Sequence, residues 1–158
     1  MKRGTVFGIV CFLLIVMFTA ARVFYVTEEP KIKKQQEAVS LMQDEVQFQE
    51  ITDFYWFNTS ETYYSIAGTT VEGNQVYAIV SPDTKEVVVL DRAKCISEYE
   101  AKAITLQEKK PQAVKQARLG MLKGEPVWEV NYQISEHSIG YYYILAKNGQ
   151  WIIDIENI

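Results

Sequence analysis

Residues 76–91, VYAIVSPDTKEVVVLD, and residues 141–156, YYYILAKNGQWIIDIE, align without a gap at a separation of 65 residues. Each stretch has an apolar strand, a polar four-residue turn and a second apolar strand that ends in an acidic residue. Asn148–Gly149 tolerates positive φ and favours a tight hairpin, whereas Pro82–Asp83 begins a turn of another type. The pattern predicts two hairpins at corresponding places in two halves of the chain.

The second half also carries the elements that should precede its hairpin. Ser97 and Glu100 are spaced as a capping box, in which the serine caps a helix and the glutamate occupies its third position. We expect this helix to run to about Gln107. Alternating apolar residues then predict strands at residues 113–122 and 127–134.

The first half shows the same order of elements. Pro30 suits the first turn of a helix, whose apolar residues continue to Met42, and strands are expected at residues 46–57 and 63–71. Each half therefore predicts one helix packed on a face of a sheet of about four antiparallel strands, which is an α+β fold. The alternative is a single α+β domain of roughly seven or eight strands without duplication.

The start of the chain predicts a membrane anchor. Residues 4–21, GTVFGIVCFLLIVMFTAA, are eighteen residues without a charge, directly after Lys2 and Arg3. At about 1.5 Å per residue, this run nearly crosses a bilayer core, and the positive charges before it place the N-terminus in the cytoplasm. We expect a single-pass transmembrane helix within residues 4–26 and an extracytoplasmic C-terminal body. A secretory signal cleaved after Ala21 is the alternative, and it exports the same body.

Composition limits the partners of the exported part. From Thr27 onward, 13 lysines and arginines stand against 20 aspartates and glutamates, a net charge of −7. This negative net charge argues against nucleic-acid binding and against electrostatic binding to anionic lipids. Cys95 is the single cysteine of this part, because Cys11 lies in the apolar run, so no disulfide forms within it. These features fit an exported bacterial protein that packing alone stabilises.

The sequence also resembles a known family. The order of helix, strands and hairpin, together with the helix start ISEYEA at residues 96–101, resembles the PepSY domain, which has a cystatin-like fold. Two such units, at residues 27–93 and 94–158, behind an anchor at residues 1–26, resemble the TseB-like family of low-GC Gram-positive bacteria. The chain departs from the PepSY pattern at Lys85, where a glycine is expected, which leaves the type of the first turn open.

The inventory of reactive side chains does not support an enzyme. His137 is the single histidine, and a nucleophilic site would have to pair it with Ser135, Ser138 or Cys95. A polar loop between two strands explains these residues equally well. Asp154 and Glu156, two residues apart on a strand, face the same side, which an exposed edge also explains. We therefore expect no catalytic residue, metal site, cofactor or small-molecule substrate.

Aromatic residues are the better indication of binding. Several strands carry consecutive rings, so that alternate rings must face opposite sides of the strand. Tyrosine and other aromatic residues are favoured at protein interfaces. The candidate interface residues are Tyr55, Phe57, Tyr63 and Tyr142. The alternative is that these rings pack between the two halves of the protein.

The resemblance to the TseB-like family implies a non-enzymatic regulator of cell-wall elongation. It further implies that the protein is anchored in the cell membrane by residues 4–26 and binds a membrane-bound penicillin-binding protein. Tethering both proteins in one membrane would allow a weak interface to suffice. The alternative that the PepSY resemblance implies is an inhibitor or chaperone-like binder of extracytoplasmic peptidases.

Overall fold

The structure is a computed structural model that describes the backbone of residues 3–156 and the side chains of residues 12–19, 22 and 30–156. The chain divides into two units, residues 1–36 and 37–158. Helix α1, Arg3–Met42, begins in the first unit, and its last residues belong to the second. Pro30 lies inside α1, so the prediction that it occupies the first turn of a helix is wrong.

The expected transmembrane helix lies mostly outside the residues with described side chains. Within those residues, no helix has an apolar stretch long enough to cross a membrane.

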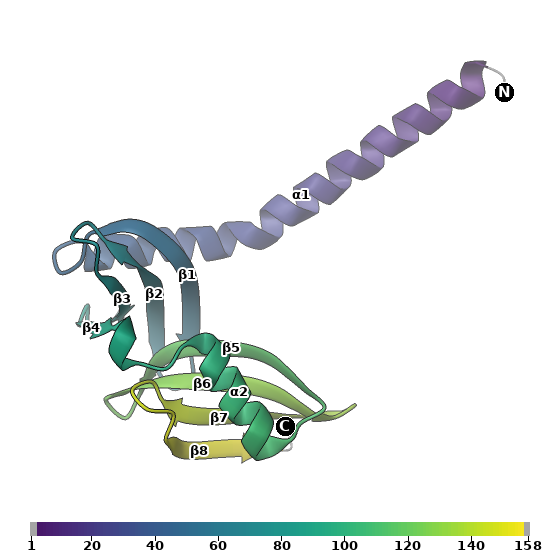
Figure 1. The fold of residues 1–158 in the computed structure, drawn as a ribbon. Helices are drawn as coiled ribbons and strands as arrows, with labels where there is room; N and C mark the ends of the chain where they lie inside the picture. The colour runs from purple at the N-terminus through teal and green to yellow at the C-terminus, as the bar shows by residue number, and fades with distance from the viewer. Residues whose placement is uncertain (1–2, 157–158) are drawn as a thin grey trace. The chain divides into compact units, whose positions relative to one another are not determined.

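The unit of residues 37–158 contains two four-stranded antiparallel sheets (Figure 1). In the first sheet the strands lie side by side in chain order: β1 Phe48–Asn58, β2 Thr62–Thr70, β3 Gln75–Val80 and β4 Val87–Asp91. The second sheet repeats this order: β5 Ala113–Leu122, β6 Glu125–Ser135, β7 Ser138–Leu145 and β8 Trp151–Glu156. The α+β fold with two antiparallel sheets is thus as the sequence predicted.

The two sheets are joined by the short helix η1, Arg92–Lys94, and by helix α2, Glu98–Lys109. The predicted capping box begins α2. The Ser97 hydroxyl accepts a hydrogen bond from the Glu100 amide at 3.2 Å, and the Glu100 carboxylate accepts one from the Ser97 amide at 2.7 Å. Lys110 ends α2 in the left-handed conformation, directly before Pro111. The local sequence therefore sets both ends of α2.

The first sheet uses both of its faces. One face packs on the end of α1, where Ala38 and Met42 are fully buried against Ile66 and Ala78. The other face contributes Tyr55 and further residues to a core that it shares with the second sheet and α2. This second burial makes the two sheets one folded body, because neither could be removed without exposing the apolar surface of the other.

The shared core closes around β5, one of the two edge strands of the second sheet. Tyr55 and Phe57 point to the same side of β1. The Tyr55 ring meets Trp128, whereas Phe57 packs with Val127, which faces the opposite side of the second sheet. Gly120 of β5 allows this approach, since a Cβ there would lie 2.2 Å from Cγ of Phe57. Strand β1 of the first sheet therefore contacts both faces of the second sheet, on either side of its edge strand β5.

The two aligned hairpins close in the same way. The Lys85 amide donates to the Ser81 carbonyl and the Gly149 amide donates to the Leu145 carbonyl, each at 2.8 Å. Lys85 has φ of +60° and Gly149 has φ of +72°. The expectation of a different turn type after Ser81 is therefore wrong, because Lys85 adopts the left-handed conformation that glycine adopts in the second hairpin. Lys85 and Gly149 are 64 residues apart, whereas the aligned stretches 76–91 and 141–156 are 65 residues apart, so the two turns match with a shift of one residue.

Candidate binding groove beside strand β4

Strand β4 is an edge strand of the first sheet, with β3 as its one neighbour in that sheet. Its residues 87–90 are three valines and a leucine. Val88 and Leu90 turn toward the shared core and are half-buried, whereas Val89 points away and is 44% exposed. One side of β4 thus forms the wall of a groove. On the other side, Val87 packs against the core at the end of α1 and Val89 is exposed.

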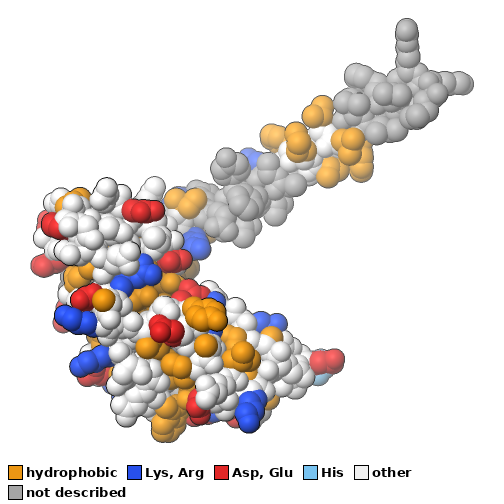
Figure 2. Space-filling model, viewed as in Figure 1, with side chains coloured by type: hydrophobic (Ala, Val, Ile, Leu, Met, Phe, Trp, Pro, Cys, Tyr) orange, Lys and Arg blue, Asp and Glu red, His pale blue; other side chains and the backbone are white. Residues whose placement is uncertain are grey.

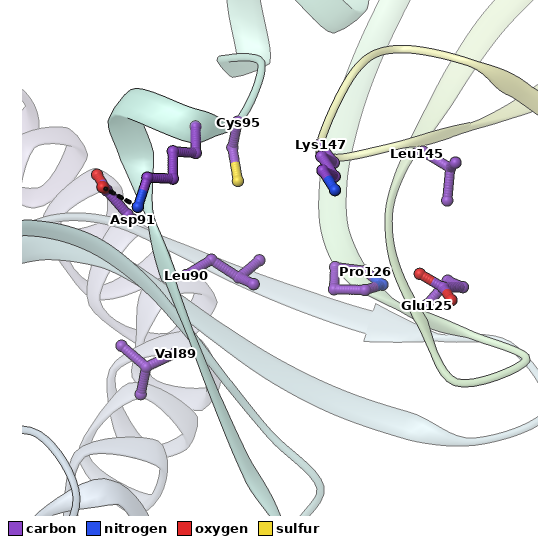
Figure 3. A pocket seen from close by; sticks show the side chains of 9 residues that line it. Val89, Leu90, Asp91, Cys95, Glu125, Pro126, Leu145 and Lys147 are labelled. Carbon is purple, nitrogen blue, oxygen red and sulfur yellow. Dashed lines mark ion pairs between the residues drawn. The ribbon is translucent and has the colours of Figure 1, made fainter.

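The groove has an apolar part of about 500 Å³ between β4, the start of β6 and the end of β7 with the turn that follows it (Figure 3). Leu90 points toward Pro126 at the start of β6, and Val89, Leu145 of β7 and Cys95 also line the space. The rim carries charges of both signs: Asp91, Lys94, Glu125 and Lys147. Lys94 is held by Asp91 at 3.5 Å. We call this part the apolar hollow.

Burial raises the pKa of the Cys95 thiol, and the nearby Asp91 carboxylate raises it further. The thiol therefore stays protonated near neutral pH, which makes it a poor nucleophile. His137 is exposed in the turn between β6 and β7, while Cys95 lies beside η1 in the apolar hollow. In the part of the chain with described side chains, no three His, Cys, Asp or Glu residues gather as a metal site.

A second part of the groove, of about 470 Å³, adjoins the first, since Pro126 lines both. Its floor includes Val88 and Met121, and its acidic residues are Glu61, Asp83 and Glu86. No lysine or arginine is among the described residues that line it. We call this part the acidic hollow, and the two hollows together the β4 groove.

Tyr63 is the one candidate interface residue that lines the groove. It is half-buried, and its hydroxyl donates a hydrogen bond to the Glu61 carboxylate at 2.5 Å. This hydrogen bond, together with burial, raises the pKa of Tyr63 to about 12. Its ring also lies 6.2 Å from that of Phe57. Tyr63 therefore links the acidic hollow to the core.

The other three candidate residues are buried within the unit. Tyr55 is 8% exposed, and its hydroxyl donates to the Glu98 carboxylate at 3.0 Å. Phe57 is fully buried, and Tyr142 packs its ring under the Lys109 ammonium, 5.4 Å from the ring centre. Tyr55 and Phe57 occupy the position that the alternative interpretation gave them, between the two sheets. In this conformation the three rings do not form a surface for a partner.

Two polar clusters were missed by reasoning from the sequence. Lys109 joins α2 to β8 by ion pairs with Asp154 and with Glu156, the latter at 2.9 Å, so these two acids do not form a free edge. Glu129, only 3% exposed, accepts a hydrogen bond from the Tyr143 hydroxyl at 2.7 Å. The sequence held no signal for these clusters, since the partners are 14 to 47 residues apart.

The architecture is that of an α+β protein made of two antiparallel sheets that share a core, with a groove at the free edge of the first. Residues 37–81 match the family model described as the cell wall elongation regulator TseB-like domain. This match confirms the resemblance to the TseB-like family over residues 37–81. None of the curated proteins matches the chain.

Solved structures of three bacterial proteins are similar to parts of this chain. The YpmB protein from Bacillus subtilis is 24% identical, with a TM-score of 0.67 over 76% of this chain and 94% of that chain. A Clostridium difficile protein described as a lipoprotein candidate is 14% identical, with a TM-score of 0.41 over 84% and 92%. The YpeB C-terminal domain from Bacillus megaterium is 14% identical, with a TM-score of 0.33 over 78% and 63%. The likeness to YpmB shows the fold.

Proposed function

We propose that the protein is a non-enzymatic regulator of cell-wall elongation, anchored in the cell membrane, that binds a membrane-bound penicillin-binding protein. The observation that carries this proposal is the match of residues 37–81 to the TseB-like domain, whose description names regulation of cell-wall elongation. The apolar run at residues 4–21 supports an anchor, with the tandem PepSY-like units at residues 27–93 and 94–158 outside the cell.

The structure supports binding more than chemistry. The β4 groove has an apolar wall and charges at its rim, which is the composition of a site for a protein segment. Its thiol has a raised pKa and is a poor nucleophile. Such a protein would act by binding. The anchor would hold the groove close to other proteins of the same membrane and raise their effective concentration.

The proposal is tested in the bacterium that carries the protein. A photo-crosslinking residue replaces exposed Val89 in the full chain, and crosslinked partners are identified by mass spectrometry. We expect a penicillin-binding protein, and we expect cells without the protein to elongate abnormally. Repeated capture of peptidases alone, with inhibition of those peptidases by the purified chain, would replace the proposal with the inhibitor alternative.

The anchor is tested separately. Residues 1–26 are replaced by a cleavable export signal, so that the same body is released outside the membrane. We expect the released form to accumulate in folded form, to lose the crosslink and to fail to restore normal elongation. Full restoration by the released form would show that anchoring is not part of the function.

A further inference from the structure

Strand β4 differs from the other edge strands of the two sheets. The ladders that β1, β5 and β8 form with their neighbours each contain a register irregularity, whereas β4 pairs with β3 without one. Residues 87–90 of β4 carry no charge or proline. Bulges, charges and prolines are the usual protection of an exposed edge against another strand. In the described part of the chain, β4 is the edge strand whose ladder has no irregularity and whose one charged residue, Asp91, stands at its end.

The backbone of β4 is arranged to pair with another strand. The Ser81 amide donates to the Glu86 carbonyl at 3.2 Å, and the next pair along the ladder is Val80 with Val87. Hydrogen-bonded and non-hydrogen-bonded pairs alternate in an antiparallel ladder. The alternation therefore points the amide and carbonyl groups of Val87 and Val89 away from β3, where the structure places no neighbouring strand.

The two hollows lie at the spacing of alternate side chains on a strand. Val88 lines the acidic hollow and Leu90 lines the apolar hollow, two residues further along the same face of β4. A segment added beside β4 would place every second side chain on this face. One of these side chains would enter the acidic hollow and the next would enter the apolar hollow.

Charge selects the chemistry of the segment. The acidic hollow has three carboxylates, and Asp83 and Glu86 form no ion pair with the described residues. A lysine or arginine fits this end, because it would bring a positive charge to a hollow lined by three carboxylates. The adjoining hollow, lined by Leu90, Pro126 and Leu145, fits a leucine-sized side chain.

We propose that β4 binds an extended segment of a partner protein as a fifth strand of the first sheet. The segment has a basic residue and an apolar residue two positions apart, which occupy the acidic and the apolar hollow. This inference deepens the proposed function, on which it rests for the existence of a protein partner, by naming the surface and the class of segment. Main-chain hydrogen bonds supply affinity, and the two hollows supply specificity.

The probe is a seven-residue peptide of β-favouring residues with lysine at its third position and leucine at its fifth. Two matched peptides serve as controls: one has glutamate in place of lysine, and the other has lysine and leucine adjacent. Binding to the purified full chain in detergent is measured by fluorescence anisotropy. We expect the lysine peptide to bind about tenfold more tightly than either control, which is the effect of one charge-assisted hydrogen bond.

Hydrogen–deuterium exchange locates the bound peptide. Saturating lysine peptide should slow exchange in residues 86–91 and leave the segment of β8, Trp151–Glu156, unchanged.

Val89→Pro removes an outward amide and should weaken binding about tenfold. Glu86→Lys should weaken it similarly, whereas Glu50→Lys, the same change of charge on β1, should not. Circular dichroism tests whether each variant is folded. If Val89→Pro does not fold, the comparison of Glu86→Lys with Glu50→Lys tests the inference.

Several outcomes overturn the inference: no protection of residues 86–91, equal binding of the glutamate peptide, or equal effects of Glu86→Lys and Glu50→Lys. A dimer of the chain that occupies β4 and is lost in Val89→Pro would also overturn it. The proposed function fails by a different result, which is the absence of a crosslinked penicillin-binding protein in cells. Loss of peptide binding with that crosslink retained would refute the β4 inference alone.

Discussion

The hairpins β3–β4 and β7–β8 have the same turn but different surroundings. Each turn is closed by equivalent backbone hydrogen bonds, with Lys85 in one and Gly149 in the other at positive φ. The last strand of the second hairpin is fixed to α2, because Lys109 bridges to Asp154 and Glu156. The last strand of the first hairpin has one ion pair among the described residues, from its terminal Asp91 to the exposed Lys94 of η1, and it borders the β4 groove. One topology therefore provides a closed edge in one sheet and an open edge in the other.

Trp128→Ala should have the largest effect, because this ring joins the two halves. It stacks edge-on against Tyr55 at 5.2 Å and Tyr77 at 5.8 Å, and its indole donates to the Ile96 carbonyl at 3.0 Å. We expect a loss of about 3–5 kcal/mol in the free energy of unfolding. Urea denaturation followed by circular dichroism measures it.

Both sheets should still unfold in one transition in this variant. Trp56→Ala is the matched control, since Trp56 is 42% exposed, and it should cost less than about 1 kcal/mol. Separate transitions of the two sheets in the wild-type chain would contradict the shared core.

Gly149→Lys gives the second hairpin the residue that the first has at this position. The substitution should destabilise by about 1–2 kcal/mol, because an L-residue in the left-handed conformation is strained. In addition, a Cβ at Gly149 would lie 2.6 Å from Cδ1 of Ile104. Thermal unfolding measures the loss, and Gln150→Lys at the next, exposed position should change little. An unchanged melting temperature would show that the two turns tolerate lysine equally.

Lys109→Met removes the bridge that closes the β8 edge, and we expect a loss of about 1 kcal/mol at neutral pH, since partly exposed ion pairs are screened. Burial opposes the charge on Lys109, but the hydrogen bonds that its ammonium donates to Asp154 and Glu156 raise its pKa overall. Its hydrogen bonds in turn lower the pKa of Asp154 and Glu156 below their ordinary 3.8 and 4.5.

The sign of the pH dependence follows from these shifts. Carboxylates with a lowered folded-state pKa stabilise the fold above their ordinary pKa, and this contribution is lost as the pH falls through the folded-state values. Wild-type stability should therefore decrease below pH 4.5, and Lys109→Met should decrease less steeply. Parallel pH profiles from denaturant titrations would contradict the role of this bridge.

Lys85→Gly should have the smallest effect and the opposite sign. Relief of the left-handed lysine exceeds the extra chain entropy of glycine, so we expect stabilisation by about 0.5–1 kcal/mol. Asp83→Gly in the same turn, where φ is not positive, should destabilise instead. If both glycine variants destabilise the protein, the strain at Lys85 has been overestimated.

Local sequence was sufficient wherever a few neighbouring residues decide the geometry. Ser97 and Glu100 indicated the start of α2, and the alternation around Trp128 indicated β6, because caps and strand faces depend on residues within one turn or one pleat. The family resemblance followed from the same order of elements. Pro30 was misinterpreted, because a proline is compatible with the first turn of a helix but does not prove that the helix begins there.

The candidate site was not predictable in the same way. An aromatic residue favours a core and an interface for the same physical reason, so sequence alone did not separate buried Tyr55 and Phe57 from half-exposed Tyr63. The β4 groove combines residues of both sheets, from Glu61 to Lys147, and no sequence pattern predicts that they come together.

The sequence by itself determined the two helix-and-hairpin halves, the acidic charge and the apolar leader, since these depend on composition and short-range periodicity. The tertiary structure decided which faces are buried. It placed Phe57 against Gly120, gave Lys109 its carboxylate partners and left β4 uncovered. Long-range packing made these choices, because burial depends on residues that are distant in the chain and adjacent in space.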